Sequence, residues 1–233
     1  MKLRGRRECA DCGERWSYFE TGAVECPACG SVRSRAIDEE GALHTAGGAA
    51  LDLDAARRAA GEEPVREVAR LAADAARAFL AERGFLDAGE LRPLDDVTVA
   101  AAELRAAADH LKRSMAADEA AEWYLLALLR GAPDGERPDE LPVGFEAVRG
   151  RAIAAAVERY RADLSRHLTE HPDADAQRVL GTLRDHVRRV EALDGDVPPS
   201  EAEGLLEAAR AIGEHLRGED SALARAERRL SDL

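Results

Sequence analysis

The sequence predicts a mostly α-helical protein, in which a bundle of about six or seven helices follows a small N-terminal unit of three short strands. Three observations carry this prediction. All four cysteines lie within the first 29 residues, in two copies of the pattern C-x-x-C-G. The composition changes once, near residue 37. From Leu51 onward, apolar residues recur at the three- and four-residue spacing of amphipathic helices.

This change in composition divides the chain into three predicted units. Residues 1–37 form the cysteine-rich unit, residues 38–50 a glycine-containing linker without a regular period, and residues 51–233 the helical part. The first unit has seven basic and five acidic side chains and a net charge of +2. Because the whole chain has a net charge of −13, the rest carries −15.

The acidic composition is accompanied by a shortage of lysine. Lys2 and Lys112 are the only lysines, so 31 of the 33 basic residues are arginine. This composition is typical of proteins from salt-loving microbes, because at about 1 M salt the Debye length is only about 3 Å and repulsion between surface carboxylates is screened. Drift in a GC-rich genome is the alternative explanation of the same bias.

The apolar stretches are too short for a membrane span or a secretory leader, which leads us to expect a cytoplasmic protein. Because the cytoplasm is reducing, paired C-x-x-C units there favour metal binding or redox chemistry over structural disulfides.

Prolines, glycines and capping residues set the expected helix boundaries. The first helix is expected to start around Pro64 and to stop before Gly84. A long helix should run from about residue 145 to 171, where Pro172 stops it, and Asp173 should cap the next one. The other expected helices follow Asp95 or Asp96, Asp118, Ser200 and Ser221, and a proline-containing loop is expected over residues 132–142.

Two further expectations concern the helical part. Nothing in it predicts a strand. The glycines inside the predicted helices would allow close helix packing, at about 1 kcal/mol of helix propensity each; they are Gly150, Gly181, Gly204 and Gly213. Trp123 and Tyr124 are expected in the core of the bundle.

The cysteine pattern, C-x2-C-x13-C-x2-C, suits one tetrahedral Zn²⁺ ion held by four thiolates. The predicted ligands are Cys9, Cys12, Cys26 and Cys29. Gly13 and Gly30 directly follow the second cysteine of each pair, where a left-handed backbone would aim amide groups at the sulfurs. A dithiol redox centre and an iron or iron–sulfur site remain as alternatives.

Three short strands are expected around these cysteines: two within residues 15–25, joined by a turn at Thr21 and Gly22, and a third within residues 32–37. A unit of about 35 residues buries too little apolar area to fold alone, and bound zinc contributes about 10–16 kcal/mol to such folds.

The two C-x-x-C-G knuckles resemble a zinc ribbon of the transcription factor B type. The resemblance covers residues 1–37 only, since the helical part lacks the motifs of the cyclin-type repeats in that factor. Taken whole, the chain resembles an uncharacterised haloarchaeal family that has a ribbon followed by alanine-rich helices. The ribbon resemblance implies a setting in transcription or related information processing, and the family implies no defined activity.

Two other groups of residues are candidate sites. Five arginines of the ribbon, together with Trp16 and Tyr18, could contact nucleic acid; they are Arg4, Arg6, Arg7, Arg33 and Arg35. The sequence from His167 to His171 matches H-x-x-E-H, a zinc peptidase pattern. Because it ends at Pro172 and has no assignable third ligand, a solvated helix end is the preferred interpretation.

The leading functional hypothesis is a non-enzymatic protein whose ribbon docks to another macromolecule, while the helical part supplies a second surface that could also mediate self-association. A direct DNA- or RNA-binding regulator that uses the ribbon arginines is the alternative. An enzyme housed in the helical part comes third, since we find no catalytic motif in the chain.

Overall fold

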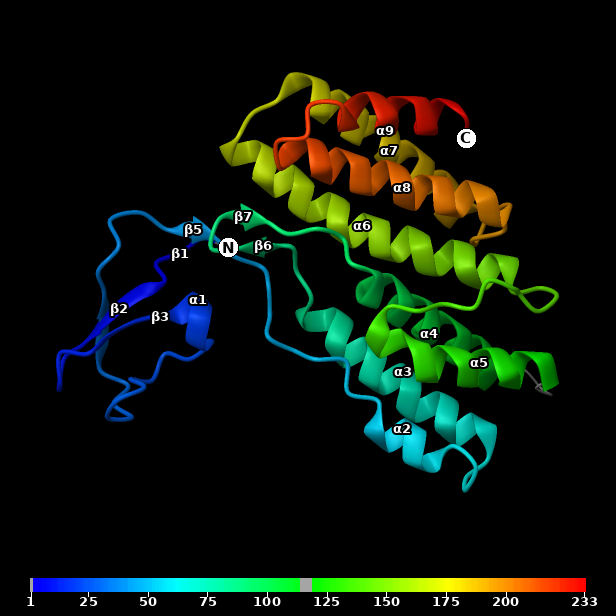
Figure 1. Ribbon diagram of the computed structural model, residues 1–233, viewed down its shortest axis with the longest axis horizontal. Helices are drawn as coiled ribbons and strands as arrows, with labels where there is room; N and C mark the ends of the chain where they lie inside the picture. The colour runs from blue at the N-terminus through cyan, green and yellow to red at the C-terminus, as the bar shows by residue number, and fades with distance from the viewer. Residues whose placement is uncertain (1, 114–118) are drawn as a thin grey trace.

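Helices make up most of the chain, and short strands precede them, as the sequence predicts. The structure is a computed structural model that describes residues 2–113 and 119–233. In Figure 1 the long helix α6, Glu146–Glu170, runs between a lower group of helices and an upper group. The lower group is α2 (Asp54–Ala59), α3 (Val65–Glu82), α4 (Asp96–Arg113) and α5 (Glu119–Gly131), and the upper group is α7 (Ala174–Ala192), α8 (Pro199–Leu216) and α9 (Ala222–Ser231).

Two apolar clusters form the core of the helical part. One contains most of the buried side chains of α6 to α9, the other contains those of α2 and α5, and α3 contributes to both. The helices α4 and α6 contribute residues to both clusters and pack directly against each other. Many of the buried residues are alanines, whose small side chains let the helix backbones approach closely.

Most of the expected helix boundaries agree with the structure. Pro64 directly precedes α3, and Asp173 caps α7, where its Oδ1 accepts a hydrogen bond of 2.9 Å from the Ala176 amide. Ser200 was the wrong cap for α8, because that helix already begins at Pro199, a residue whose fixed φ suits the first turn. The expected cap Asp118 lies outside the described residues.

The helical part contains a hairpin that the sequence did not predict. Strands β6 (Leu86–Asp87) and β7 (Glu90–Leu91) pair antiparallel, with Leu86 opposite Leu91. The two turn residues between them have positive φ, 51° at Ala88 and 91° at Gly89. Hairpin turns of this kind favour Asn or Gly at both positions, so the alanine conceals the turn in the sequence.

The N-terminal unit has a three-stranded antiparallel sheet in the order β3-β2-β4. Its strands are β2 (Arg6–Cys9), β3 (Arg15–Ser17) and β4 (Ser34–Ala36). Three strands thus form one sheet as expected, but one of them was expected at the wrong position, and β1 (Lys2–Leu3) is a further strand that was not expected. The central strand, β2, ends at Cys9, and residues Tyr18–Thr21 form the helical turn α1 instead of a strand. Gly22, at a φ of 65°, ends that turn.

Residues 38–50, predicted as a linker, contact both parts of the molecule. Strand β5 (Ala42–Leu43) pairs with β1 (Lys2–Leu3), so the N-terminus of the chain is tied to this segment. The hydroxyl of Thr45 donates a hydrogen bond of 2.7 Å to Oδ2 of Asp163, a residue of α6 that is only 1% exposed. These contacts place the cysteine-rich unit beside one end of the helical part (Figure 1).

Candidate metal centre

The four cysteines lie together although they come from two separate turns. Cys9 ends strand β2 and Cys12 lies in the turn that follows, whereas Cys26 and Cys29 lie in the loop between α1 and β4. All four Sγ atoms lie within 4.8 Å of one another. The Sγ atoms of Cys9 and Cys29 are 3.7 Å apart, and those of Cys12 and Cys26 are 3.5 Å apart.

These distances fit a single tetrahedral zinc ion. With Zn–S bonds of about 2.3 Å, neighbouring sulfurs of a regular tetrahedron lie about 3.8 Å apart. The measured separations of 3.7 and 3.5 Å are close to this edge length. The cysteines are free of disulfides, so all four sulfurs can serve as ligands, and together they would complete the coordination sphere. The predicted ligand set is therefore brought together as one possible metal site.

The two knuckles have the same backbone structure. In the first, the Gly13 amide donates to the Cys9 carbonyl at 3.2 Å, and in the second the Gly30 amide donates to the Cys26 carbonyl at 2.8 Å. Both glycines are left-handed, with φ of 78° and 71°. The geometry that the sequence predicts for each C-x-x-C-G unit is thus present twice.

Backbone amides lower the pKa values of Cys9 and Cys12, whereas the neighbouring thiols lower the pKa of Cys9 and raise that of Cys12. The amides of Cys12 and Asp11 lower the pKa of Cys9 to about 6. For Cys12, the Glu14 amide acts to lower the pKa, but hydrogen bonds with the thiols of Cys29 and Cys26 raise it overall, to about 12. Four thiolates this close repel one another, and a divalent cation would relieve that repulsion.

Around the cysteines, residues 1–37, which we call the ribbon, have a very small apolar core. It consists of Cys9, Trp16 and Cys26, which are 3%, 8% and 2% exposed. The Trp16 indole donates a hydrogen bond of 3.2 Å to the Ala23 carbonyl and so holds the loop after α1 against the sheet. Two apolar residues of the cysteine-bearing loop, Val24 and Val32, are instead 51% and 67% exposed.

The five arginines predicted as possible nucleic-acid contacts do not form one cluster. Arg33 pairs with Asp11 at 2.9 Å, and Arg35 pairs with Glu8 at 2.9 Å. Arg7 donates to the Ser34 hydroxyl at 2.9 Å. Arg4 is exposed, and the Nε atom of Arg6 lies 4.0 Å from Oδ1 of Asp38.

One face of the sheet is nevertheless basic, and it includes an arginine that the sequence analysis missed. In the register of the sheet, Glu8 lies opposite both Arg15 and Arg35, and its carboxylate pairs with both. Arg6 lies two residues from Glu8 on the same strand and therefore on the same face. Arg15 could have been found from this period-two pattern only if β2 had been recognised as the central strand.

The H-x-x-E-H sequence ends α6 without forming a metal site. His171 is exposed, as expected of a solvated helix end, but His167 is only 8% exposed. The two rings stack with centroids 4.4 Å apart, and Nδ1 of His167 has no hydrogen-bond partner among the described residues. Burial and the neighbouring His171 lower the pKa of His167. Within the described residues, only the cysteine cluster brings three or more potential ligand side chains together.

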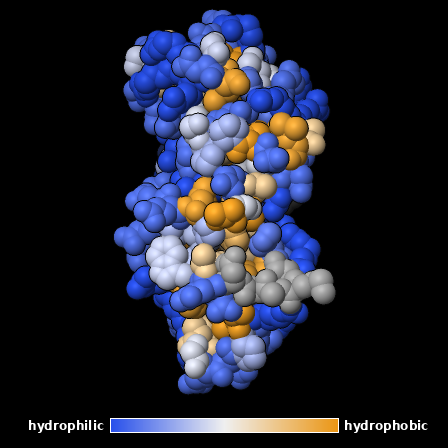
Figure 2. Space-filling view, turned by 90° about the vertical axis from the view of Figure 1, so that its right-hand side faces the viewer, coloured by the Kyte–Doolittle hydropathy of each residue, from blue (hydrophilic) through white to orange (hydrophobic). Residues whose placement is uncertain are grey.

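Tyr124 and Trp123 differ in burial. Tyr124 is fully buried as predicted, whereas Trp123 is 54% exposed, which corrects the expectation that it belongs to the core. Helix α5 turns Trp123 and Leu126, which is 42% exposed, toward the surface. On the face that Figure 2 shows, hydrophobic side chains gather in separate groups between hydrophilic ones.

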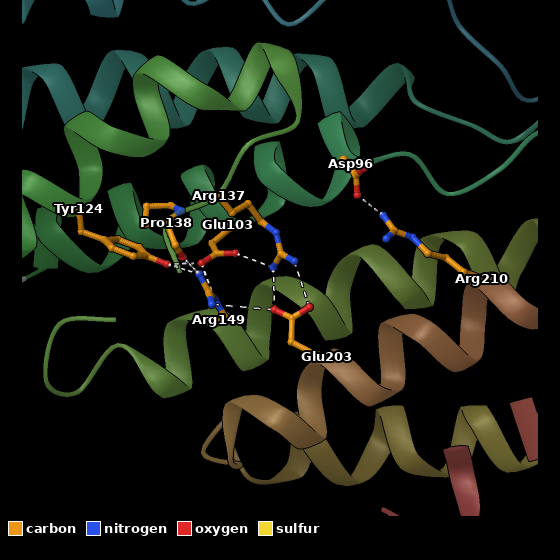
Figure 3. Close-up of polar contacts among 8 residues, drawn as sticks. All are labelled: Asp96, Glu103, Tyr124, Arg137, Pro138, Arg149, Glu203 and Arg210. Carbon is orange, nitrogen blue, oxygen red and sulfur yellow. Dashed lines mark hydrogen bonds and ion pairs between the residues drawn. The ribbon is translucent and has the colours of Figure 1, made fainter. Parts of the chain in front are cut away.

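A second polar cluster lies buried between α4, α5, α6 and α8 (Figure 3). Glu103 is fully buried and accepts hydrogen bonds from the Tyr124 hydroxyl and from Arg149, whose Nε lies 2.8 Å from Oε1. Arg137 bridges Glu103 to Glu203, with both of its distances to the Glu203 carboxylate at 3.0 Å. Each charge has an opposite partner, so the cluster resembles a structural ion-pair network more than a catalytic set.

No helix in the described parts of the chain is both long enough and apolar enough to cross a bilayer. A family model for proteins of unknown function, DUF7117, matches residues 1–230. Comparisons with curated proteins and with solved structures found no match. The chain therefore belongs to the family DUF7117.

Proposed function

We propose that this chain is a non-enzymatic zinc-binding protein that acts as an adaptor, with a structural zinc ribbon as one of its interaction surfaces. The observation that carries the proposal is the set of four sulfurs within 4.8 Å on two matching knuckles. Four protein ligands fill a tetrahedral zinc site and leave no position for a substrate, which is typical of structural zinc. A reducing cytoplasm would keep the four thiols available to the metal.

The surroundings of the site favour zinc over the alternatives. Thioredoxin-type redox centres lie in a βαβ unit, whereas these cysteines lie in turns of a small antiparallel sheet. An iron site could use the same four sulfurs. Zinc remains the proposal because the unit resembles a zinc ribbon of the transcription factor B type, and that resemblance also suggests a role in transcription by analogy.

The exposed apolar residues of the ribbon support a protein partner. Val24 and Val32 lie in the loop that carries the second cysteine pair, and each exposes more than half of its surface. Apolar side chains on a surface held rigid by a metal can dock into another protein with little loss of conformational entropy. The exposed Trp123 of α5 offers a second contact surface in the helical part, for a partner or a second copy of the chain.

The experiment that tests the proposal measures metal content and partner capture together. We expect one zinc per chain by elemental analysis, and protein partners that are retained from a lysate of the source organism by the wild-type chain. Cys9→Ser combined with Cys12→Ser should abolish both. Val32→Asp should retain the zinc and lose the partner, whereas Val143→Asp, at a residue of the helical part that is 99% exposed, should retain both. Absence of stoichiometric zinc from the wild-type chain would refute the proposal.

A nucleic-acid-binding regulator is the second candidate, and the basic sheet face favours it. Arg15 and Arg35 pair with Glu8 there, and Arg6 on the same face lies near Asp38. Exposed ion pairs of this kind are easily exchanged for phosphate contacts. The double substitution Arg15→Glu and Arg35→Glu should abolish retention on immobilised DNA or RNA, whereas Arg58→Glu on the exposed surface of α2 should not. Retention that persists in the double variant would eliminate this candidate.

A further inference from the structure

A cavity of about 280 Å³ lies between α4 and α6, away from the cysteine cluster. Leu80 of α3 also lines it. Its remaining apolar lining consists of alanine side chains, and their methyl groups leave the space that larger residues would fill. These alanines are Ala102, Ala106, Ala152, Ala155 and Ala156.

Four guanidinium groups and a single carboxylate complete the lining. Arg105 and Arg113 come from α4, two turns apart, and Arg151 and Arg159 come from α6 with the same spacing. The carboxylate belongs to Asp109, which pairs most closely with Lys112, at 2.7 Å. Positive charge therefore predominates in this cavity, in a helical part that is otherwise strongly acidic.

Arg159 differs from Arg105 and Arg151 of the same lining, which pair with Asp109 and Asp194. It is half-buried, and it makes no hydrogen bond or ion pair with any residue that the structure describes. Burial, and then the nearby Arg105, lower its pKa, whereas Asp163 acts in the opposite direction. An anion placed between Arg105 and Arg159 would relieve this unfavourable arrangement.

Other hollows in the described surface are lined by comparable numbers of arginines but are neutralised. The groove between α8 and α9 contains Arg225 and Arg229, which pair with Glu214 and Glu207. The hollow on the other side of Arg159 also contains Glu158, Asp163 and Glu191. The cavity between α4 and α6 differs from these hollows because its lining sets a single carboxylate against four arginines. Two of the four, Arg105 and Arg151, pair with Asp109 and Asp194.

We propose that this cavity binds a small phosphorylated molecule with an aliphatic body. A phosphate monoester carries close to two negative charges, and guanidinium groups bind its oxygens in bidentate pairs. A single carboxylate would neutralise fewer of the four arginines. The body is aliphatic because the lining offers methyl groups and one leucine, with neither an aromatic ring for stacking nor a neutral polar side chain for hydrogen bonding.

The position of the arginines favours a small ligand over nucleic acid. They converge on one concavity from two facing helices, whereas a backbone of successive phosphates requires basic residues along a groove. The site is also independent of the ribbon, since none of its lining residues comes from residues 1–53. Failure of the zinc proposal would leave this inference unaffected.

Binding of hexyl phosphate and inorganic phosphate to the full-length, metal-loaded protein tests the proposal by calorimetry. We expect saturable binding of one hexyl phosphate per chain, at least about tenfold tighter than phosphate, because each buried methylene strengthens binding by up to about fourfold. Arg159→Ala should weaken binding by about tenfold or more through loss of charge-assisted hydrogen bonds. Ala155→Leu, at an exposed position of the lining, should obstruct the hexyl chain.

The control is Arg188→Ala, which removes an exposed arginine from α7 and should leave the affinity unchanged. Circular dichroism of each variant establishes that the helices remain folded. The proposal is overturned if neither compound binds, if phosphate binds as tightly as hexyl phosphate, or if Arg188→Ala weakens binding as much as Arg159→Ala. It is also overturned if a single-stranded oligonucleotide binds through Arg159 while hexyl phosphate does not.

Discussion

The ribbon and the helical part stabilise their folds by different means. In the ribbon, the buried apolar cluster consists of Cys9, Trp16 and Cys26, and two of these three residues are the proposed metal ligands. In the helical part, two extended apolar clusters meet along α4 and α6. We therefore expect the small unit to depend on a metal held by its four cysteines, whereas the larger unit can depend on buried area.

The two parts also differ in where their charged residues lie. The ribbon has a net charge of +2, and its ion pairs, such as Arg33 with Asp11, lie at the surface. The helical part is strongly acidic, yet it buries a network in which Glu103 is fully enclosed by Arg149, Arg137 and Tyr124. Electrostatic changes should therefore have small effects on ribbon stability and large effects at the centre of the helical part.

Metal removal is expected to produce the largest difference between the two parts. Chelation, or Cys26→Ser, should abolish amide protection in β2, β3 and β4, because about 10–16 kcal/mol of metal binding would be lost from a unit with little other core. Helix α6 should retain its protection. Hydrogen exchange followed by mass spectrometry measures both regions in one sample, and Val32→Ser provides an exposed control in the same loop. Unchanged protection of the strands after chelation would contradict a metal-dependent ribbon.

Neutralising the buried carboxylate of Glu103 should destabilise the helical part. Glu103→Gln leaves the Arg149 charge, itself 7% exposed, without its main partner. We expect a loss of about 3–5 kcal/mol in the free energy of unfolding, as for other broken buried ion pairs. Denaturant unfolding followed by circular dichroism measures this loss.

The matched control for this variant is Glu203→Gln. Glu203 belongs to the same network, but its side chain is 32% exposed and water can solvate the partners it leaves. We therefore expect a smaller loss, of about 1 kcal/mol. Equal losses in the two variants would show that burial of Glu103 does not determine the strength of the network.

The sequence predicted best those features that depend on neighbouring residues. The two C-x-x-C-G knuckles recur in the structure with left-handed glycines, and Asp173 caps α7, because each feature is determined within about four residues. The hairpin at residues 86–91 was missed because its strands have two residues each and its turn uses Ala88. Local patterns that short carry too little information to be distinguished from a loop.

Features that depend on distant partners were not predictable. Glu103 is charged, and a charged residue is ordinarily expected at the surface. Its burial depends on Arg149 and Arg137, which follow it by 46 and 34 residues. The exposure of Trp123 depends on how α5 packs, since its neighbour Tyr124 takes the buried position. The cavity beside Arg159 likewise arises only when α4 and α6 face each other.

Substitution of glycines within the helices tests how closely neighbouring helices pack in the helical part. A Cβ atom on Gly213 would overlap the hydroxyl of Tyr160, which is fully buried and has no room to move. Gly213→Ala should therefore destabilise the protein by about 1–3 kcal/mol. A Cβ atom on Gly181, by contrast, would have no neighbouring heavy atom within 4 Å, so Gly181→Ala should stabilise α7 by up to about 1 kcal/mol. Thermal unfolding of the pair measures both, and equal shifts would contradict close packing at α8.

Removal of the Asp173 cap of α7 should have the smallest effect on stability, and this effect should depend on pH. The Ala176 amide, and then His215, lower the pKa of Asp173 below its usual value of 3.8. The resulting stability is present above that value and is lost as the pH falls through the lower pKa of the folded state. Asp173→Ala should cost about 1 kcal/mol near neutral pH and progressively less below pH of about 4. Asp175→Ala, at a side chain 78% exposed in the same first turn, is the control and should show little change. If urea unfolding shows that Asp173→Ala costs as much at pH 2 as at pH 7, ionisation of Asp173 does not stabilise the helix, and the hydrogen bond to Ala176 acts without the charge.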